Sequence, residues 1–184
     1  MERPTSTAQL QDGALAGNWC LDPRRSSVEF TTKALWGLVP VMGVFHKFSG
    51  SAAVVPCGQV RGTLTVKTAS VDTKNTRRDQ HLRSADFFDS DNHPDITFVA
   101  DAIQPFARRV TVTGTLSLRG RSKRMSLDAT ASFGHDRELC LDAEARIDRA
   151  DFEMTWGRRM GVGMVTAVEV HLVFTPPAPI KGAS

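Results

Sequence analysis

Apolar and polar residues alternate one by one along most of this chain. The clearest example is the stretch 110–118, where Val110, Val112, Leu116 and Leu118 alternate with threonine and serine. The same two-residue period recurs at residues 60–67, 96–102, 125–133, 139–147 and 168–174. Strict alternation with one apolar face predicts half-buried antiparallel strands.

Two further strands are predicted at residues 27–33 and 44–55, and no stretch carries a helical period of useful length. Polar turns at residues 119–122 and 134–137 join successive strands at hairpin distance. About eight strands with one apolar face each indicate a closed antiparallel barrel or a sandwich. A barrel also removes the exposed edges that long strands would otherwise present.

The apolar face of the predicted strands is rich in small residues. An eight-stranded barrel is either just filled by large side chains or able to hold a small ligand. Small residues favour the hollow barrel, whereas phenylalanine and leucine side chains from facing strands would fill the same space. The pattern alone supports both interiors equally. The small residues are Gly62, Ala100, Ala102, Gly114, Ala129, Ala131, Ala143 and Ala145.

Residues 71–98 interrupt the alternation with a dense group of charged residues, two adjacent phenylalanines and a proline. We expect a short helical insertion around residues 74–90. Asp72 and Thr73 are suited to cap its start, and Pro94 stops any helix before the next strand.

Asp79 and His81 in this insertion are candidates for an acid–base pair, because a neighbouring carboxylate tunes a histidine near neutral pH. The alternative is a structural connection, in which Arg78, Asp79 and Arg83 form salt bridges and His81 is satisfied among them. The structural alternative is favoured, because no serine, cysteine or second carboxylate lies where a catalytic triad or a glycosidase pair would need it.

The length of 184 residues predicts one domain, at residues 18–175, between flexible tails at 1–17 and 176–184. The net charge is only +3 without a run of four basic residues, so we expect no nucleic-acid partner. No segment has the apolar length that crosses a bilayer, so we expect no stable membrane insertion. The N-terminal residues lack the pattern of a signal peptide, which predicts a cytoplasmic protein.

Neither a cofactor nor a metal is expected. The three cysteines, Cys20, Cys57 and Cys140, lie far apart and are predicted to be free thiols. The five histidines have no i, i+2 or i, i+4 spacing and none pairs with a cysteine. The glycine-rich stretch 157–163 lacks the ending of a phosphate-binding loop.

Large apolar side chains gather beside the loops more than on the regular strand faces. Such residues pack as a lid over a core, or they meet an acyl or prenyl chain that enters a barrel. Because burial of each methylene contributes ~0.8 kcal/mol, a long apolar ligand needs few polar contacts. These side chains are Trp36, Met42, Phe45, Phe48, Phe87, Phe88, Met154 and Trp156.

Several motifs, in this order along the chain, resemble those of the YceI-like family. The most specific is RDxHLRSxxFFD at residues 78–89. The motifs LDP at 21–23 and GxFxxFxG at 43–50 precede it, and PxITF at 94–98 and IDRxDF at 147–152 follow it. The resemblance covers roughly residues 19–175.

The resemblance implies an all-β fold, an eight-stranded antiparallel lipocalin-like barrel whose elongated cavity holds a polyisoprenoid or a similar long-chain lipid. The polar head of the ligand would lie near the mouth, and the protein would not be an enzyme. Arg78, His81 and Arg158 are predicted at the head group or mouth. The predicted cavity lining is Phe30, Trp36, Met42, Phe45, Phe48, Leu64, Phe87, Phe98, Leu116, Met154 and Trp156.

Three positions depart from the family's pattern. Arg25 and Ala34 stand where members often carry histidine, and Glu153 stands where glycine is common. If these positions contact the head group, the ligand differs from that of the best-known members.

The leading hypothesis is a carrier or store of an isoprenoid, quinone or similar lipid. One alternative is an enzyme that acts on a small apolar substrate through Asp79 and His81. Another is a homodimeric interaction module that uses residues 36–45 as its contact.

Overall fold

The computed structural model describes residues 16–54, 60–106, 109–134 and 138–176. Residues 1–15 and 177–184 of the predicted tails, the residue Cys57 and most of the predicted turn at 134–137 lie outside these residues, whereas Gly17 of the predicted N-terminal tail begins β1. Cys20 and Cys140, which are described, are free thiols.

Eleven antiparallel strands make up a single sheet. Their order around the sheet is β1-β4-β5-β7-β8-β9-β10-β11-β2-β3-β6, with a further pairing of β1 and β11. The strands are β1 Gly17–Leu21, β2 Ser27–Ala34, β3 Val39–Phe45, β4 Phe48–Val54, β5 Val60–Lys67, β6 Val71–Asp72, β7 Asp95–Phe106, β8 Arg109–Leu118, β9 Arg121–Phe133, β10 Leu139–Asp148 and β11 Val165–Thr175.

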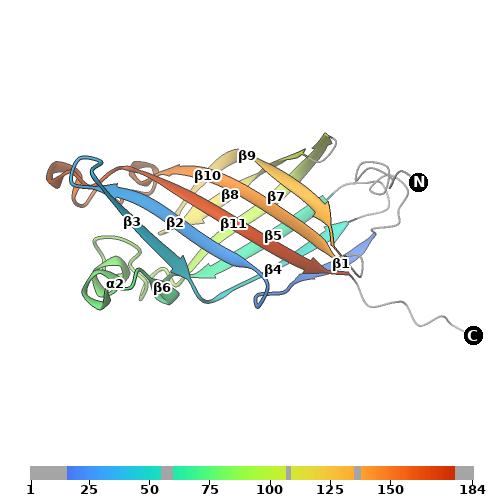
Figure 1. The fold of residues 1–184 in the computed structure, drawn as a ribbon, viewed down its shortest axis with the longest axis horizontal. Coiled ribbons are helices and arrows are strands. Elements are labelled where there is room, and N and C mark those ends of the chain that lie inside the picture. The colour runs from blue at the N-terminus through green and yellow to red at the C-terminus, as the bar shows by residue number, and fades with distance from the viewer. Residues whose placement is uncertain (1–15, 55–59, 107–108, 135–137, 177–184) are drawn as a thin grey trace, which may run out of the picture.

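The sheet closes into a barrel (Figure 1). Each of the first three passes of the chain is divided by a short break, so that β1 continues into β2, β3 into β4 and β5 into β6. Eight passes therefore form the ring, and each pass pairs with the next in sequence. The predicted eight-stranded antiparallel barrel is confirmed.

The break between β1 and β2 lies against β11, where the ring closes. β11 pairs with β1 at Phe174 and Thr175 and with β2 from Ala167 to His171. Between these two pairings, the Asp22 amide donates to the Val173 carbonyl at 2.8 Å and the Val173 amide donates to Ser26 Oγ at 2.9 Å. Because both backbone groups of Val173 are satisfied, the break leaves no open edge in the barrel.

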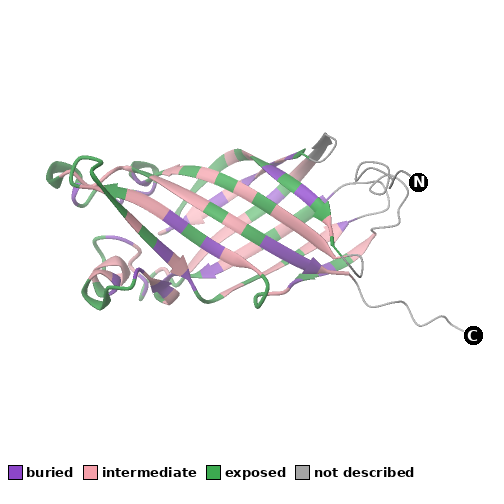
Figure 2. Ribbon diagram, viewed as in Figure 1, coloured by how far each residue is buried: buried purple, intermediate pink, exposed green. Residues whose placement is uncertain are grey.

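More buried and less buried positions alternate along the strands (Figure 2), as buried and intermediate residues do in β8. The alternation is interrupted in β7, where a β-bulge shifts the register between Ala100 and Ala102. After the bulge, Ile103 pairs with Val112 and packs into the core. The sequence pattern predicted Ala100 and Ala102 on the same face. They lie on different faces, because the extra residue of a bulge reverses the side-chain parity.

One end of the barrel is filled. Trp19 and Leu21 of β1 pack there with Val54, Val60, Leu172 and Phe174. A neighbouring cluster contains Ala100, Val110, Val112, Ala129 and Ala131. Small residues such as Ala100, Ala129 and Ala131 therefore allow close packing in this region and do not enlarge a cavity. The interior is both filled and hollow, each over part of its length.

Gly114 shows how tight this packing is. A Cβ atom at this position would collide with the Val99 carbonyl oxygen and would lie 2.8 Å from the ring of Phe98. We expect Gly114→Ala to lower the free energy of unfolding by about 1–3 kcal/mol, measured by denaturant titration, because backbone atoms cannot yield as a flexible side chain can. Gly134→Ala is the control, since among the described residues its Cβ would meet no atom closer than 3.5 Å. Equal stabilities of the two variants would show that the strands separate at little cost.

Candidate functional site

The segment between β6 and β7 folds over the other end of the barrel (Figure 1). Its helix α2 spans Thr76–Arg83. The Asn75 side chain caps the first turn by accepting from the Arg78 amide at 3.0 Å, and Ser84 Oγ donates to the His81 carbonyl at 2.8 Å at the last turn. The predicted helical insertion is confirmed, although the cap is Asn75 and not Asp72 or Thr73.

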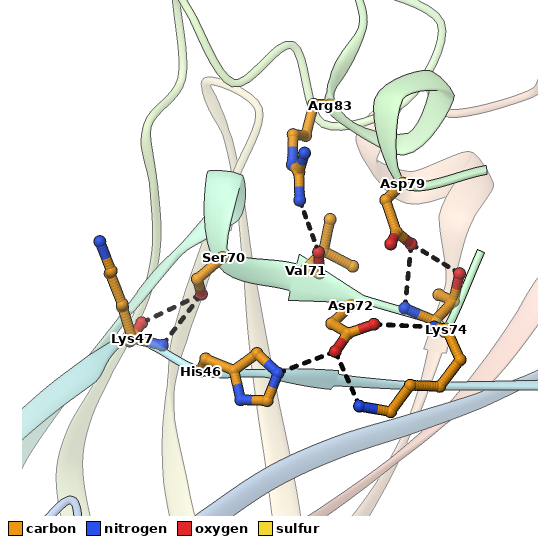
Figure 3. A network of polar contacts seen from close by, with 9 residues as sticks. His46, Lys47, Ser70, Val71, Asp72, Lys74, Asp79 and Arg83 are labelled. Carbon is orange, nitrogen blue, oxygen red and sulfur yellow. Dashed lines mark hydrogen bonds and ion pairs between the residues drawn. The ribbon is translucent and has the colours of Figure 1, made fainter. Parts of the chain in front are cut away.

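The charged residues of this segment fix α2 to the edge of the barrel. Asp79 is buried and accepts from the Thr73 amide at 2.9 Å and from Thr73 Oγ1 at 2.6 Å. Arg78 donates to Thr73 Oγ1 and to the Thr73 carbonyl, and Arg83 donates to the Val71 carbonyl at 2.8 Å. Figure 3 shows Arg83 reaching Val71 of β6 and Asp79 reaching the chain directly after β6, at Thr73. These contacts form a polar brace between the helix and the sheet.

A second polar contact continues the brace on its exposed side. Asp72 accepts from His46 Nε2 at 3.0 Å, from the Lys74 amide at 2.7 Å and from Lys74 Nζ at 2.9 Å (Figure 3). The hydrogen bond from His46, followed by those from Lys74, lowers the pKa of the Asp72 carboxyl well below its usual range. The Asp72 carboxylate therefore stabilises the folded state fully at a pH above its pKa in the unfolded chain. This contribution is lost as the pH falls through the lowered pKa of Asp72 in the folded protein.

The structure does not bring the side chains of Asp79 and His81 together. Asp79 is directed at Thr73, whereas His81 Nε2 lies 3.0 Å from Asp86 Oδ2. The two are separated because residues two apart on a helix point in different directions. This arrangement does not form the predicted acid–base pair.

A cavity of about 410 Å³ occupies the barrel at the α2 end. Its wall is made by apolar side chains from β2, β3, β5 and β7 to β11, and α2 covers it. Val112, Ala143, Ala145 and Val168 are among the strand residues whose inward faces form this wall. The space suits an apolar chain and offers little to a polar molecule.

Ten of the predicted site residues lie in the cavity wall. They are Phe30, Phe45, Leu64, Phe87, Phe98, Leu116, Met154, Trp156, Arg78 and His81. Whether any of them contacts a ligand stays a prediction.

Four predicted site residues lie elsewhere. Trp36 and Met42 are 77% and 67% exposed, Trp36 in the turn after β2 and Met42 on the outer face of β3. Phe48 packs between two core clusters, and Arg158 is exposed in the 3-10 helix Arg158–Met160. Met42 and Phe45 were both predicted to line the cavity, but residues three apart in a strand point to opposite sides, and only Phe45 lies in the cavity wall.

Arg149 lies in the cavity wall and was not among the predicted site residues. Its guanidinium donates to the Gly163 carbonyl from Nε at 3.1 Å and from Nη2 at 2.8 Å, and it lies over the Phe87 ring at 5.3 Å. Burial lowers the pKa of Arg149. The sequence contained the signal, because Ala143, Ala145 and Ile147 alternate inward and Arg149 continues their parity.

Three rings close the mouth of the cavity. His81 lies edge-on to Trp156 at 4.2 Å and to Phe87 at 5.1 Å, and Phe87 lies 5.4 Å from Trp156. His81 and Phe87 belong to the segment between β6 and β7, and Trp156 belongs to the loop between β10 and β11. A ligand that passes the mouth therefore has to separate contacts between side chains and does not have to break a hydrogen-bonded sheet.

The ionisable residues in the cavity wall are all basic: Arg78, His81 and Arg149. Among the described residues of the wall there is no carboxylate, and His81 finds its carboxylate outside it, at Asp86. Such a site attracts an amphiphile whose polar head carries acceptor oxygens. The described part of the chain contains no group of three side chains that would hold a metal ion. It also contains no helix long and apolar enough to cross a membrane.

The comparison with known families gives a direct result. A model of the YceI-like domain matches residues 19–175. The chain belongs to the YceI-like family. The resemblance carried by RDxHLRSxxFFD and its neighbouring motifs is thereby confirmed.

Relatives and solved structures agree with this assignment. The UPF0312 protein ECA1782 of Pectobacterium atrosepticum is 35% identical over 153 residues, which are 77% of this chain and 78% of that protein. Protein YceI of Escherichia coli O6:H1 is 35% identical over 96 residues, so this match spans 50% of each protein. The crystal structure of BcnA from Burkholderia cenocepacia has a TM-score of 0.76 at 26% identity, over 83% of this chain and 98% of BcnA.

A polyisoprenoid binding domain from Saccharophagus degradans, implicated in plant cell wall breakdown, has a TM-score of 0.74. It is 16% identical, and the match covers 86% of this chain and 98% of that domain. At this identity the comparison shows that the two proteins share the fold.

The three departures from the family's pattern take different places in this YceI-like protein. Arg25 forms an ion pair with Glu138, which raises the pKa of Arg25, and it does not line the cavity. Ala34 lies in the cavity wall. Glu153 has a φ of 58°, a left-handed conformation that glycine adopts freely, and it pairs with Arg121. Of the three positions, only Ala34 lines the cavity.

The brace predicts that Asp79 acts on stability. We expect Asp79→Ala to lower the free energy of unfolding by about 1–3 kcal/mol, because it leaves the buried Thr73 amide and hydroxyl without their acceptor. Asp79→Asn keeps an acceptor oxygen and is expected to cost less. Thermal and denaturant unfolding measure both variants. An Asp79→Ala protein with unchanged stability would contradict the structural role of the brace.

Proposed function

We propose that this YceI-like protein binds and carries or stores a long-chain isoprenoid, quinone or similar lipid in its barrel cavity, without catalysing a reaction. The apolar cavity of about 410 Å³ is the observation that carries this proposal. Its volume falls in the range of about 300–1,000 Å³ that is usual for small-molecule sites. The likeness to a polyisoprenoid binding domain gives further support.

The apolar lining accounts for retention of the ligand's tail. Each buried methylene contributes ~0.8 kcal/mol, and the filled end of the barrel limits how far a tail extends. The side chains that meet the tail would include Phe30, Leu64, Phe98 and Leu116, which line the cavity from four different strands. Storage needs no reactive group, which agrees with the separate directions of Asp79 and His81.

The head of the ligand would lie beside Arg149, within the basic mouth. No described carboxylate lies at ion-pair distance from this buried guanidinium, and Nη1 has no hydrogen-bond partner among the described residues. Thr32 Oγ1 in the same cavity wall is also buried without a partner. Unpaired donors at the end of an apolar cavity favour a ligand whose head offers oxygen acceptors, because such a head satisfies them.

The cytoplasmic location and a homodimeric state stay predictions. Neither is needed for the proposed binding, since the cavity is formed within one chain.

Binding should depend on the length of the ligand. In a series of alcohols or fatty acids, we expect the affinity to rise about fourfold per methylene until the cavity is full. Displacement of a fluorescent acyl probe measures the affinities.

The substitution Ala145→Phe should lower the affinity for every chain by at least about tenfold, because the new phenylalanine ring occupies the cavity. Glu144→Phe, with the same substitution on the outer face of β10, is the control. Failure of every chain length to bind, together with an empty organic extract by mass spectrometry, would rule out the proposed function.

Arg149 should distinguish between heads. Arg149→Met is expected to weaken binding of a carboxylate-headed chain by about 10- to 150-fold, since hydrogen bonds to charged groups contribute ~1.5–3 kcal/mol. The neutral alcohol of the same chain length should change little. Arg149→Lys retains the charge without the planar fork and should lie between. Equal losses for the acid and the alcohol would mean that Arg149 only supports the loop at Gly163.

A further inference from the structure

Large apolar side chains project into solvent at the α2 end of the barrel. Leu38 is 82% exposed, Trp36 77%, Met160 54% and Leu35 53%. Leu35, Trp36 and Leu38 lie in the turn between β2 and β3, and Met160 ends the 3-10 helix Arg158–Met160. We refer to these four residues as the apolar rim. Exposed apolar groups that cluster in this way mark an interaction surface more often than scattered ones do.

The two segments that carry the apolar rim are in direct contact. The Trp36 amide donates to the Gly161 carbonyl at 2.9 Å, and the Gly163 amide donates to the Lys33 carbonyl at 2.6 Å. The Trp36 ring lies so close to Gly161 that a Cβ atom there would be 2.7 Å from it. The rim is therefore one continuous surface built from distant parts of the chain.

The apolar rim also borders the mouth of the cavity. Ala34, the residue before Leu35, lies in the cavity wall, and so does Val162, two residues after Met160. Trp156, one of the rings that close the mouth, is itself partly exposed at 37%. A surface that covered the rim would therefore face the passage into the barrel.

Backbone conformation gives an independent indication. Leu35 and Trp36 have φ values of 48° and 55°, in the left-handed region that is unfavourable for bulky side chains and in which glycine or asparagine is usual. Their exposed side chains gain little from packing in return. Because neither stability nor solubility accounts for these two residues here, their side chains point to a binding role.

Charge differs between the apolar rim and the face of the wall formed by β2, β10 and β11. Lys33, Arg158 and Arg159 are exposed beside the apolar rim, and none pairs with an acidic side chain among the described residues. On the outer wall, Glu169 of β11 pairs in register with Glu29 of β2 and with Glu144 of β10, which sets three carboxylates side by side. An anionic surface would attract the mouth and repel this wall, so that the barrel would approach with its mouth first.

We propose that the apolar rim docks the mouth of the barrel onto the surface of an anionic phospholipid bilayer. Tryptophan and leucine side chains enter the boundary between head groups and acyl chains, and the neighbouring arginines meet the lipid phosphates. The contact is peripheral and involves side chains of two loops. A second copy of the chain fits the rim less well, because a two-fold contact would set the same cations against each other.

Vesicle co-sedimentation of the full chain tests this proposal. Wild-type protein is expected to bind vesicles of phosphatidylcholine with phosphatidylglycerol, and to bind pure phosphatidylcholine far less. Arg158→Gln with Arg159→Gln should lower the affinity for the anionic vesicles by roughly 30-fold and reduce its dependence on salt.

The double variant Leu35→Asn with Trp36→Asn removes two apolar side chains without disturbing the fold. Asparagine tolerates the left-handed backbone, so the melting temperature should stay the same or rise. Binding to the anionic vesicles should fall at least about tenfold. Val99→Asn is the control, because Val99 is an exposed apolar residue on the barrel wall, 45% exposed and away from the mouth.

Three results would overturn the proposal. The first is wild-type protein that ignores both kinds of vesicle. The second is a double asparagine variant that binds as the wild type does. The third is a variant that changes a monomer–dimer equilibrium in sedimentation velocity but not vesicle binding, which would make a second copy of this chain the occupant of the rim.

Discussion

Strand β11 is hydrogen-bonded to β1 and β2 at once, and the rest of the barrel depends on this double pairing. The chain leaves the sheet between β1 and β2. There the Asp22 amide and the Ser26 hydroxyl form the hydrogen bonds to the backbone of Val173 that a strand would otherwise form. A closed ring has few free edges, so in the described part of the chain we expect the passage to its interior at an end. Because Trp19 and its neighbours fill one end, the cavity opens toward α2.

Helix α2 covers that end because its charged residues bind it to the edge of the barrel. Asp79, Arg78 and Arg83 bind backbone or hydroxyl groups of the sheet and its edge, and they are not free for chemistry. Arg149 differs from them, since its guanidinium holds a loop carbonyl and still faces the apolar space. Asp148 acts on this guanidinium electrostatically without forming an ion pair, and a buried cation without a close partner is costly. A bound head group would provide that partner.

The same end therefore combines a hydrophobic interior, a basic mouth and an apolar outer rim. A lipid bound as proposed would have to leave a bilayer and enter the barrel with little exposure to water on the way. Contact between the rim and a bilayer would shorten that exposure, and parting of the His81, Phe87 and Trp156 rings would open the path. The proposals on the cavity and on the rim rest on different observations. Together they would place the mouth of the cavity against the bilayer that holds the lipid.

The sequence by itself determined most of the strands, the helical insertion and the family, because alternation and motif spacing are properties of neighbouring residues. Its alternation allowed a barrel or a sandwich, and the resemblance to the family favoured the barrel. The predicted strand at 44–55 is two strands in the structure, β3 at Val39–Phe45 and β4 at Phe48–Val54. Continued parity from Ala143 to Ile147 would also have found Arg149. The tertiary structure decided which small residues are packed and which line space. Gly114 and Ala100 face close neighbours, whereas Ala143 and Ala145 face the cavity.

Only the tertiary structure, likewise, directed Asp79 to Thr73, reversed Ala102 behind a bulge and turned Trp36 outward. In each case the deciding contact joins elements whose relative position depends on strand register and on loop geometry. A cavity is the space left between residues far apart in the chain, and periodicity along one strand does not specify the distance to the strand opposite.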